Sequence, residues 1–302
     1  MTGRTIIRIV IYGSAIVLGS LVLLGFTGRF LALGDSVEIV KPLTGALLIA
    51  LAMVLWFMRA RGAALASIVL AFVALGSVAP GFFASTSDCG GDCLKLYQKN
   101  LMSKAWPRYA LADDIIASGA QIVTLQEVSD HNRKFMANMF GHFPVAVICK
   151  FRPARDVAVL TSLPAIKGTE ICEPKTGLAG VQIRAPNGQL VWVLSIHLEW
   201  PFPYSQFRQS QNIAKRIAAL DGPVLIAGDF NMVPWGQSVQ RIRRAAGNRY
   251  LGAFRNTHDL GGLFLPLPID TVMVPEGATG TVELRGYMGS DHRGVLARIA
   301  LR

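Results

Sequence analysis

Charge is scarce in this sequence. Asp, Glu, Lys and Arg make up only 16% of its 302 residues, whereas 52% are hydrophobic and the mean hydropathy is +0.41. These values argue against a protein that is soluble throughout, and they indicate membrane segments joined to a domain of ordinary composition. Internal repeats and low-complexity tails are also missing from the sequence.

Three stretches near the N-terminus contain no charged residue at all. They are residues 9–26, 42–58 and 62–83, with lengths of 18, 17 and 22 residues. A helix needs about 20 apolar residues to cross a bilayer, so we predict three transmembrane helices. A signal peptide would end in a cleavage site followed by polar chain, but here a short loop leads directly into the second run. Buried core helices are the alternative for the second and third runs.

Basic residues set the predicted topology. Arg4 and Arg8 precede the first run, and Arg59 and Arg61 separate the second from the third. The positive-inside rule places these segments in the cytoplasm and the chain after residue 83 on the other side of the membrane. For a bacterial protein we therefore expect a multi-pass inner-membrane anchor at 1–84, a linker at 85–93 and a periplasmic domain at 94–302.

Cysteine is scarce as well, and its four positions all follow the third apolar run. An even number of cysteines on the exported side is typical of disulfides, and Cys89–Cys93 with Cys149–Cys172 is the simplest of three pairings. A zinc site is the alternative, but it needs four ligands with compact paired spacing. The 23 positions between Cys149 and Cys172 disfavour it.

The predicted exported part is basic, with 24 Lys and Arg against 17 Asp and Glu from residue 84 onward, a surplus of 7. Such a surplus favours an anionic partner, whether nucleic acid, phospholipid headgroups or a phosphorylated small molecule. Two basic clusters could bind phosphate, although a solvated surface is the simpler interpretation of each. They comprise Arg241, Arg243 and Arg244, and Lys150, Arg152 and Arg155.

Short β-like runs alternate with helical ones from about residue 94, which predicts one α/β domain. Polar side chains capable of catalysis stand at or beside the ends of these runs: Asn100, Glu127, His197, Asp229, Asn231, Asp270, Asp291 and His292. A rigid sheet can hold such groups at fixed separations along one rim. Taken singly, Asn100 or Asp270 could be a turn residue and His197 a packed histidine.

Six segments in this order resemble the endonuclease/exonuclease/phosphatase superfamily, the metal-dependent phosphoesterases related to deoxyribonucleases, abasic-site endonucleases and sphingomyelinases. They read "KN", "IVTLQEV", "SIHLEWP", "AGDFNMVPW", "PIDTVMV" and "GSDHRGV". The resemblance covers about residues 94–302 and implies a two-sheet α/β sandwich with a metal-centred cleft at the sheet edges. Thr271 and Gln121 depart from the pattern of many members, but neither is a core catalytic position.

The resemblance also implies a divalent cation, Mg²⁺ with Mn²⁺ able to substitute, because few protein ligands and several waters suit it. Glu127 is the expected principal ligand with Asn100 beside it. Asp291 is expected to bind the cation directly or through water.

The remaining polar residues are expected to act on water and phosphate. Asp229 would orient and help to deprotonate the attacking water, and Asn231 would donate its amide to a phosphate oxygen. Asp270 would favour the charged form of His292, which stabilises phosphoryl oxygens. His197 would contact the phosphate from the opposite side.

Three further positions receive local interpretations. Arg208 lies in the helix expected after "HLEWPFP" and is a candidate substrate-binding residue. The pair His258–Asp259 is interpreted as part of a turn, because Gly261 and Gly262 follow it. Gly228 is expected to let the chain bend as it leaves its strand.

The sequence therefore predicts a membrane-anchored, divalent-metal-dependent phosphoester hydrolase that faces the periplasm, with a slight preference for a nuclease-like phosphodiesterase. Its partners would be an anionic phosphoester substrate and, through the three helices, the lipid bilayer; no protein partner is implied. A phospholipid or lipid-phosphate phosphoesterase of the same fold is the alternative, because the anchor holds the cleft close to a membrane. A non-catalytic binding protein is the second alternative.

Overall fold

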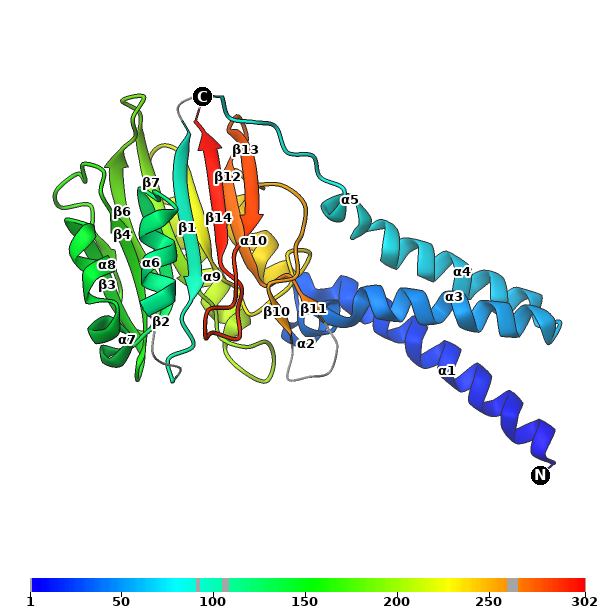
Figure 1. Ribbon diagram of the computed structural model, residues 1–302. Coiled ribbons are helices and arrows are strands. Elements are labelled where there is room, and N and C mark those ends of the chain that lie inside the picture. The colour runs from blue at the N-terminus through cyan, green and yellow to red at the C-terminus, as the bar shows by residue number, and fades with distance from the viewer. Residues whose placement is uncertain (1, 91–92, 105–108, 260–265, 302) are drawn as a thin grey trace.

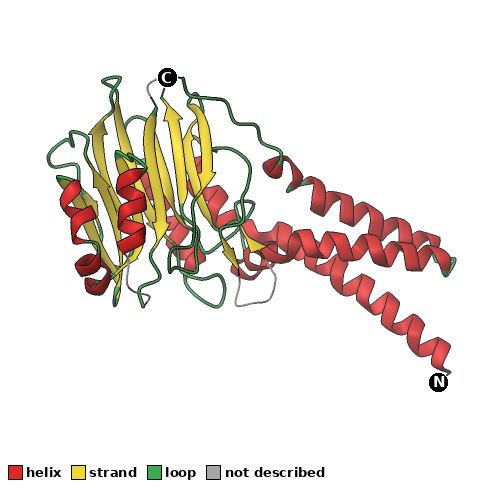
Figure 2. Cartoon of the chain, in the orientation of Figure 1, coloured by secondary structure: helices red, strands yellow, loops and turns green. Residues whose placement is uncertain are grey.

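The computed structural model describes the chain except for residues 1, 91–92, 105–108, 260–265 and 302. A group of N-terminal helices extends from one side of a β sandwich (Figures 1 and 2). The N-terminal part contains α1 (Gly3–Phe26), η1 (Thr27–Arg29), α2 (Ala32–Val37), η2 (Glu38–Val40), α3 (Lys41–Phe57), α4 (Arg61–Gly76) and α5 (Ala79–Phe82).

Two of these helical stretches are long and apolar enough to cross a membrane, judged by length and composition alone. They run over Gly3–Arg29 and Ala32–Phe57. The third predicted span, residues 62–83, is not one helix, because α4 ends at Gly76 after 16 residues and the four-residue α5 follows. Pro80 occupies the first turn of α5; a proline has no N–H to continue the preceding helix and is tolerated in the first turn. At 1.5 Å per residue α4 is about 24 Å long.

The N-terminal helices all have one end beside the sandwich. In Figure 1 the N-terminus and the turn between α3 and α4 lie at the end away from the sandwich. Arg4 and Arg8 near the N-terminus, and Arg59 and Arg61 at the turn, therefore lie at that same end. The structure thus puts the four arginines and the sandwich at opposite ends of the helices.

The sandwich consists of two six-stranded sheets. The first has the order β13 (Thr279–Leu284), β14 (Val295–Ala300), β1 (Leu94–Asn100), β2 (Ile122–Val128), β4 (Arg155–Thr161) and β3 (Val145–Arg152). The second has the order β5 (Ile171–Cys172), β6 (Leu178–Arg184), β7 (Leu190–His197), β8 (Val224–Asp229), β12 (Asp270–Pro275) and β9 (Asn248–Tyr250). A separate pair joins β10 (His258–Asp259) to β11 (Pro266–Leu267).

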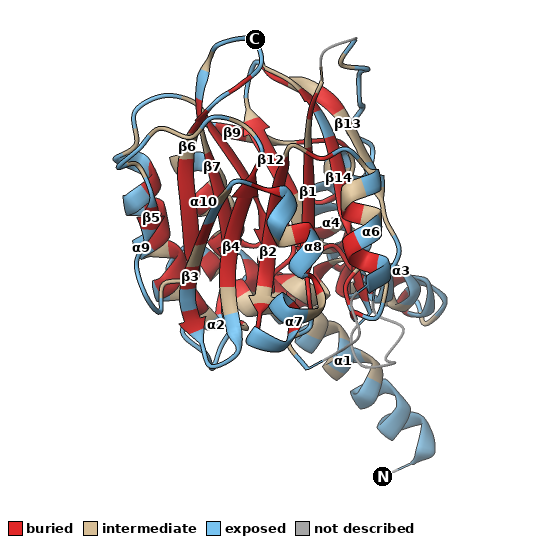
Figure 3. Ribbon diagram, turned by 60° about the vertical axis from the view of Figure 1, so that its left-hand side comes forward, coloured by how far each residue is buried: buried red, intermediate tan, exposed pale blue. Residues whose placement is uncertain are grey.

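Helices cover the outer faces of the sheets. The first sheet carries α6 (Tyr109–Ala117), α7 (Asp130–Phe135) and α8 (Ala137–His142), and the second carries α9 (Gln206–Ala218) and α10 (Gln237–Ala245). Alternate residues of a central strand therefore pack in different cores: Leu96 of β1 lies between the sheets, whereas Tyr97 lies under the helices. Figure 3 shows the central strands buried along most of their length. Burial on both faces explains why these strands are continuous apolar runs rather than alternating ones.

Strand direction brings the ends of the central strands to one edge. The pairs β1–β2 and β7–β8 are parallel, so Asn100, Glu127, His197 and Asp229 all lie near the edge where these strands end. Strand β12 runs antiparallel to β8 and begins with Asp270 at the same edge. This is the lower edge of the sandwich in Figure 1.

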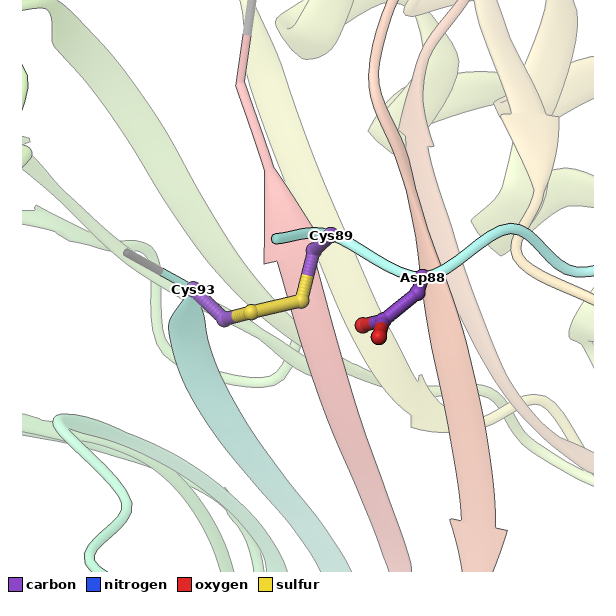
Figure 4. A group of neighbouring side chains, drawn as sticks. All are labelled: Asp88, Cys89 and Cys93. Atoms are coloured by element: carbon purple, nitrogen blue, oxygen red, sulfur yellow. A yellow bond between two sulfur atoms is a disulfide. The ribbon is translucent and has the colours of Figure 1, made fainter. Parts of the chain in front are cut away.

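All four cysteines form disulfides, Cys89–Cys93 and Cys149–Cys172. This pairing agrees with the simplest of the three predicted ones. The carboxylate of Asp88 lies near the Cys89–Cys93 bridge (Figure 4). Because disulfide sulfurs are not thiolate ligands, this group does not form the zinc site that was the alternative.

Candidate active site

The register of the second sheet places three of the predicted residues side by side. His197 of β7 pairs with Asp229 of β8, and Asp229 pairs with Asp270 of β12 on its other side. Gly228 lies within β8 rather than at a bend, so the expected bend is wrong. A Cβ at Gly228 would lie 2.0 Å from the carbonyl oxygen of Ile196, so glycine is needed there for the close approach of β7.

Asp270 and His292 form a buried pair. The Asp270 Oδ2 atom lies 2.8 Å from His292 Nδ1, and both side chains are at most 5% exposed. The other carboxylate oxygen of Asp270 accepts a 2.9 Å hydrogen bond from Gln98 Nε2. With Nδ1 directed at Asp270, the Nε2 atom of His292 is directed toward Asp229, 3.8 Å from its Oδ2.

Asp229 lies at the centre of this edge. Its Oδ2 accepts a 2.8 Å hydrogen bond from Asn100 Nδ2 and lies 3.6 Å from His197 Nε2. Its Oδ1 accepts the backbone N–H of Asn231 at 2.8 Å. Two imidazoles and an amide from three different strands and loops therefore converge on one carboxylate.

Burial and neighbouring charges give the two histidines different protonation states. Burial lowers the pKa of His197 to about 4, with Glu127 opposing the change, so this imidazole is neutral at pH 7. Burial also works against the charged form of His292, but the carboxylates of Asp270 and Asp229 outweigh it and raise the pKa of His292 to about 10. Burial raises the pKa of Asp229 above its usual range, partly offset by His292. A cationic and a neutral imidazole thus flank the same carboxylate.

Glu127 is held in an unusual backbone conformation. It has a φ of 54°, and the register of β2 against β4 shifts between Leu125 and Val128. A bulge of this kind redirects a side chain, and positive φ in a non-glycine residue is concentrated at functional sites. The Glu127 Oε2 atom accepts the backbone N–H of Ser103 at 2.9 Å, and its Oε1 lies 3.8 Å from Arg155. Burial would raise the pKa of Glu127, but the Ser103 N–H and the charges of His197 and Arg155 hold it below its usual value.

The other predicted residues lie at different distances from this centre. Asn231 is buried with a φ of 45°, and its Nδ2 donates to the carbonyl of Leu198 at 2.7 Å. Asp291 is half-exposed, and its Oδ1 lies 3.9 Å from His292 Nε2. Arg208 is exposed and lines a separate cavity of about 230 Å³ next to Glu199.

Two residues near the centre were not among the predicted site residues. His258 belongs to β10 rather than to a turn, and its ring stacks on His292 with centroids 4.4 Å apart. Lys99 is fully buried and its Nζ donates to three carbonyls of the loop that carries His292. Lys99 gave no clear signal in the sequence, because its strand also contains Lys95 and Gln98. His258 stands beside Asp259 in the sequence, but its position next to His292 depends on a long-range bridge.

The sequence profile of the Endonuclease/Exonuclease/phosphatase family matches residues 100–292, well over half of the chain. The chain belongs to this family. Similar solved structures include a humanized D. rerio TDP2 with 14 mutations, at 18% identity and TM-score 0.58, and D. rerio TDP2 complexed with single strand DNA product, at 17% and 0.58. An endonuclease/exonuclease/phosphatase from Bacteroides vulgatus matches at 11% and 0.56. Each match covers 70% of this chain and 100% of the other.

At these identities the likeness shows the fold alone, an endonuclease/exonuclease/phosphatase-type α/β sandwich. None of the curated protein sequences matches this chain. Members of the family are phosphoesterases that generally depend on a divalent metal, so membership supports the hydrolysis of phosphoric esters by this chain.

The oxygen donors at this edge fit a hard divalent cation. Glu127 on β2 offers a carboxylate, and the adjacent parallel strand β1 ends in the amide of Asn100. Carboxylate and amide oxygens are the ligands that Mg²⁺ and Mn²⁺ prefer. Among the described residues, two other groups at this edge have ligand atoms within 4.8 Å of one another: Asp229, Asp270 and His292, and His258, Asp291 and His292. Both depend on His292, whose Nδ1 is already directed at Asp270 and whose raised pKa favours the imidazolium.

A large basic cleft opens beside Glu127. It has a volume of about 960 Å³ and extends from Ser103 to the turn between β3 and β4. Five cationic side chains and two acidic ones line it: Lys104, Arg133, Lys150, Arg152 and Lys175, with Asp130 and Asp156. The cluster at residues 150–155 therefore lies beside the centre. Arg241, Arg243 and Arg244 do not line this cleft, and they make hydrogen bonds within the fold.

Proposed function

We propose that this protein is a membrane-anchored, divalent-metal-dependent phosphoester hydrolase whose catalytic domain faces the periplasm. The observation that carries the proposal is the convergence of His197, His292 and Asn100 on Asp229, with Asp270 behind His292 and Glu127 close by. Its electrostatics match a reaction in which water attacks an anionic phosphorus and negative charge builds on the oxygens.

The chain's own residues divide this chemistry. His292 is charged at neutral pH and stabilises a phosphoryl oxygen from the side of Nε2, while Asp270 fixes its ring. Asp229 orients the water and accepts its proton, and a pKa raised by burial makes it a stronger base than an exposed aspartate. His197 is neutral, so it donates or accepts a hydrogen bond without repelling the cation. Glu127, Asn100 and Asp291 would hold a divalent cation, which supplies positive charge to the phosphate.

The arrangement of the anchor supports the proposed topology. The two long apolar stretches and α4 bring Arg4, Arg8, Arg59 and Arg61 to the end away from the sandwich. This is the arrangement that the positive-inside rule requires of an exported C-terminal domain. An alkaline-phosphatase fusion at the C-terminus is expected to be active, and a well-expressed inactive fusion would contradict the topology.

Nucleic acid is one substrate class that the structure favours. The basic cleft beside Glu127 complements the charge of a polyanion. D. rerio TDP2, which shares the fold, has been solved with a single strand DNA product. A different observation, on the side of the anchor, favours a phosphoester carried by a lipid and is developed below.

A soluble phosphodiester tests the hydrolytic activity without requiring a decision between nucleic acid and lipid as the natural substrate. We expect the purified full-length protein to cleave bis(p-nitrophenyl) phosphate with Mg²⁺ and to lose the activity in EDTA. The variants Asp229→Ala and His292→Ala should be inactive, whereas His142→Ala, an exposed histidine of α8 remote from the centre, should match the wild type. Activity that survives in both site variants would refute the assignment.

A further inference from the structure

The anchor is docked onto the catalytic domain by specific hydrogen bonds. The carboxylate of Asp35 in α2 accepts the backbone N–H groups of Gln237 and Ser238 at 2.6 and 3.0 Å, together with the Ser238 hydroxyl, at the N-terminus of α10. Trp235 donates its indole N–H to the Glu38 carbonyl at 2.7 Å. Asp35 and Glu38 are at most 2% exposed. Because the contacts are buried, the domain is held in one orientation relative to α1 and α3.

A second contact from α2 reaches the loop that leaves the catalytic centre. This loop, residues 198–205, follows His197 directly, and the backbone N–H of Phe202 donates to the Ser36 hydroxyl at 2.9 Å. Within the loop, the ring of Trp200 lies 6.4 Å from that of His258, which itself stacks on His292. The loop therefore joins the catalytic centre to the end of the anchor.

Exposed apolar side chains gather on both sides of that contact. Phe202 and Tyr204 of the loop are 55% and 62% exposed. Phe30, Leu31 and Leu33, which precede Ser36, are 75%, 53% and 47% exposed. We name these five residues the interfacial rim. It continues the exposed apolar surface at the adjoining ends of α1 and α3, where Phe26 and Leu43 are half-exposed.

The position of the rim along the anchor is that of a bilayer surface. Residues 27–40 connect the end of α1 to the start of α3 beside the sandwich (Figure 1). A membrane that takes up α1, which is about 36 Å long, has its headgroup layer at this connection. Aromatic side chains are enriched at that level, because their rings suit the boundary between hydrocarbon and water.

Resting on the function proposed above, we propose that the interfacial rim lies in the bilayer surface and that the substrate is a phosphoester carried by a membrane lipid. The lipid tails would remain in the bilayer on the side of the interfacial rim, and the phosphate would enter the catalytic centre from that side. The anionic headgroup would then point toward the basic cleft, which lies by β3 and β4 at the edge of the sandwich away from the anchor (Figure 1). The change from apolar to cationic surface across the centre matches the polarity of such a substrate.

The test uses the full-length protein in vesicles of phosphatidylethanolamine and phosphatidylglycerol, with and without phosphatidic acid. Phosphatidylethanolamine and phosphatidylglycerol are lipid phosphodiesters, phosphatidic acid is a lipid phosphomonoester, and bis(p-nitrophenyl) phosphate is the soluble control. We expect the wild type to cleave at least one lipid. The double variant Phe202→Ser/Tyr204→Ser should cleave that lipid at least about tenfold more slowly, because two aromatic side chains no longer enter the bilayer. Its rate on the soluble diester should not change.

Two further variants exclude a simple loss of structure. Leu190→Ser alters an exposed apolar residue at the other end of β7 from His197 and should leave both rates unchanged. Phe30→Ser/Leu33→Ser alters the anchor side of the rim and should reproduce the selective loss on lipid.

The remaining outcomes separate this inference from the proposed function. Cleavage of the soluble diester or of plasmid DNA that depends on Asp229, with all three lipids left intact, would overturn the inference and leave the hydrolase standing. Equal losses on lipid and soluble diester in both rim variants would overturn it as well. If the wild type cleaves neither the soluble diester, nor plasmid DNA, nor any lipid, the proposed function fails too.

Discussion

Replacing Asp270 by Asn tests the electrostatic core of the site with little change in shape. Asp270 and His292 are both buried, and their hydrogen bond of 2.8 Å joins two charged groups. Such bonds contribute about 1.5–3 kcal/mol. At 1.36 kcal/mol per factor of ten in rate, we expect kcat to fall about 10- to 150-fold.

The raised pKa of His292 gives the scale of the electrostatic interaction. Burial lowers this pKa, but Asp270, Asp229 and Asp291 outweigh burial, and the net rise from 6.5 to about 10 corresponds to about 5 kcal/mol in favour of the imidazolium. In the wild type His292 stays charged until the pH approaches 10, and the stability that its raised pKa contributes is present below pH 6.5 and lost as the pH rises toward 10. Without Asp270 the pKa falls, so the alkaline limb of the activity profile should move to lower pH.

The assay is the pH dependence of kcat and KM on bis(p-nitrophenyl) phosphate at saturating Mg²⁺. Asp259→Asn is the matched control, because Asp259 is exposed and accepts a hydrogen bond from Tyr287 instead of a histidine. A wild-type kcat and alkaline limb in Asp270→Asn, or an equal loss of kcat in Asp259→Asn, would contradict this role of Asp270.

Three further predictions concern the anchor, the metal and the disulfide. Asp35→Ala leaves two backbone N–H groups at the start of α10 unpaired. It should lower the free energy of unfolding in detergent by about 1–3 kcal/mol, whereas substitution of the exposed Asp113 by Ala should not. Equal melting temperatures for Asp35→Ala and the wild type would show that the contact adds no stability. Glu127→Gln removes the charge of the proposed principal ligand and should raise the Mg²⁺ concentration for half-maximal activity at least about tenfold; an unchanged Mg²⁺ titration would contradict the proposed role of Glu127. Cys149→Ser/Cys172→Ser opens a loop of 23 residues and should cost about 3 kcal/mol of stability, measured by denaturant unfolding; a variant as stable as the wild type would contradict this.

The central strands could be predicted from the sequence because each is a short apolar run that is buried on both faces. The runs that contain "IVTLQEV", "LVWVLSI" and "VLIA" correspond to β2, β7 and β8. Strands β6 and β13 were not predicted, because β6 is interrupted by Gly180 and Gln182 and β13 is a partly exposed edge strand. Local propensity is weak in such segments, and pairing with β7 and β14 decides their structure.

The sequence also placed polar residues at strand ends, and parallel pairing brings most of them to one edge. It could not give the register that sets Asp229 between His197 and Asp270, since a shift by one residue would turn each side chain to the other face. The sequence could not predict the contact of His258 with His292 either, because that contact also depends on long-range pairing.

The sequence by itself determined the family and the apolar character of the N-terminal part, because both depend on residue types and their order. Only the tertiary structure decided which two helical stretches are long enough to span a membrane and how the domain is held against them. That orientation depends on contacts such as the one between Asp35 and Ser238, which are 203 positions apart. No local pattern encodes a contact of that separation, because it forms only when the sandwich presents α10 to the end of the anchor.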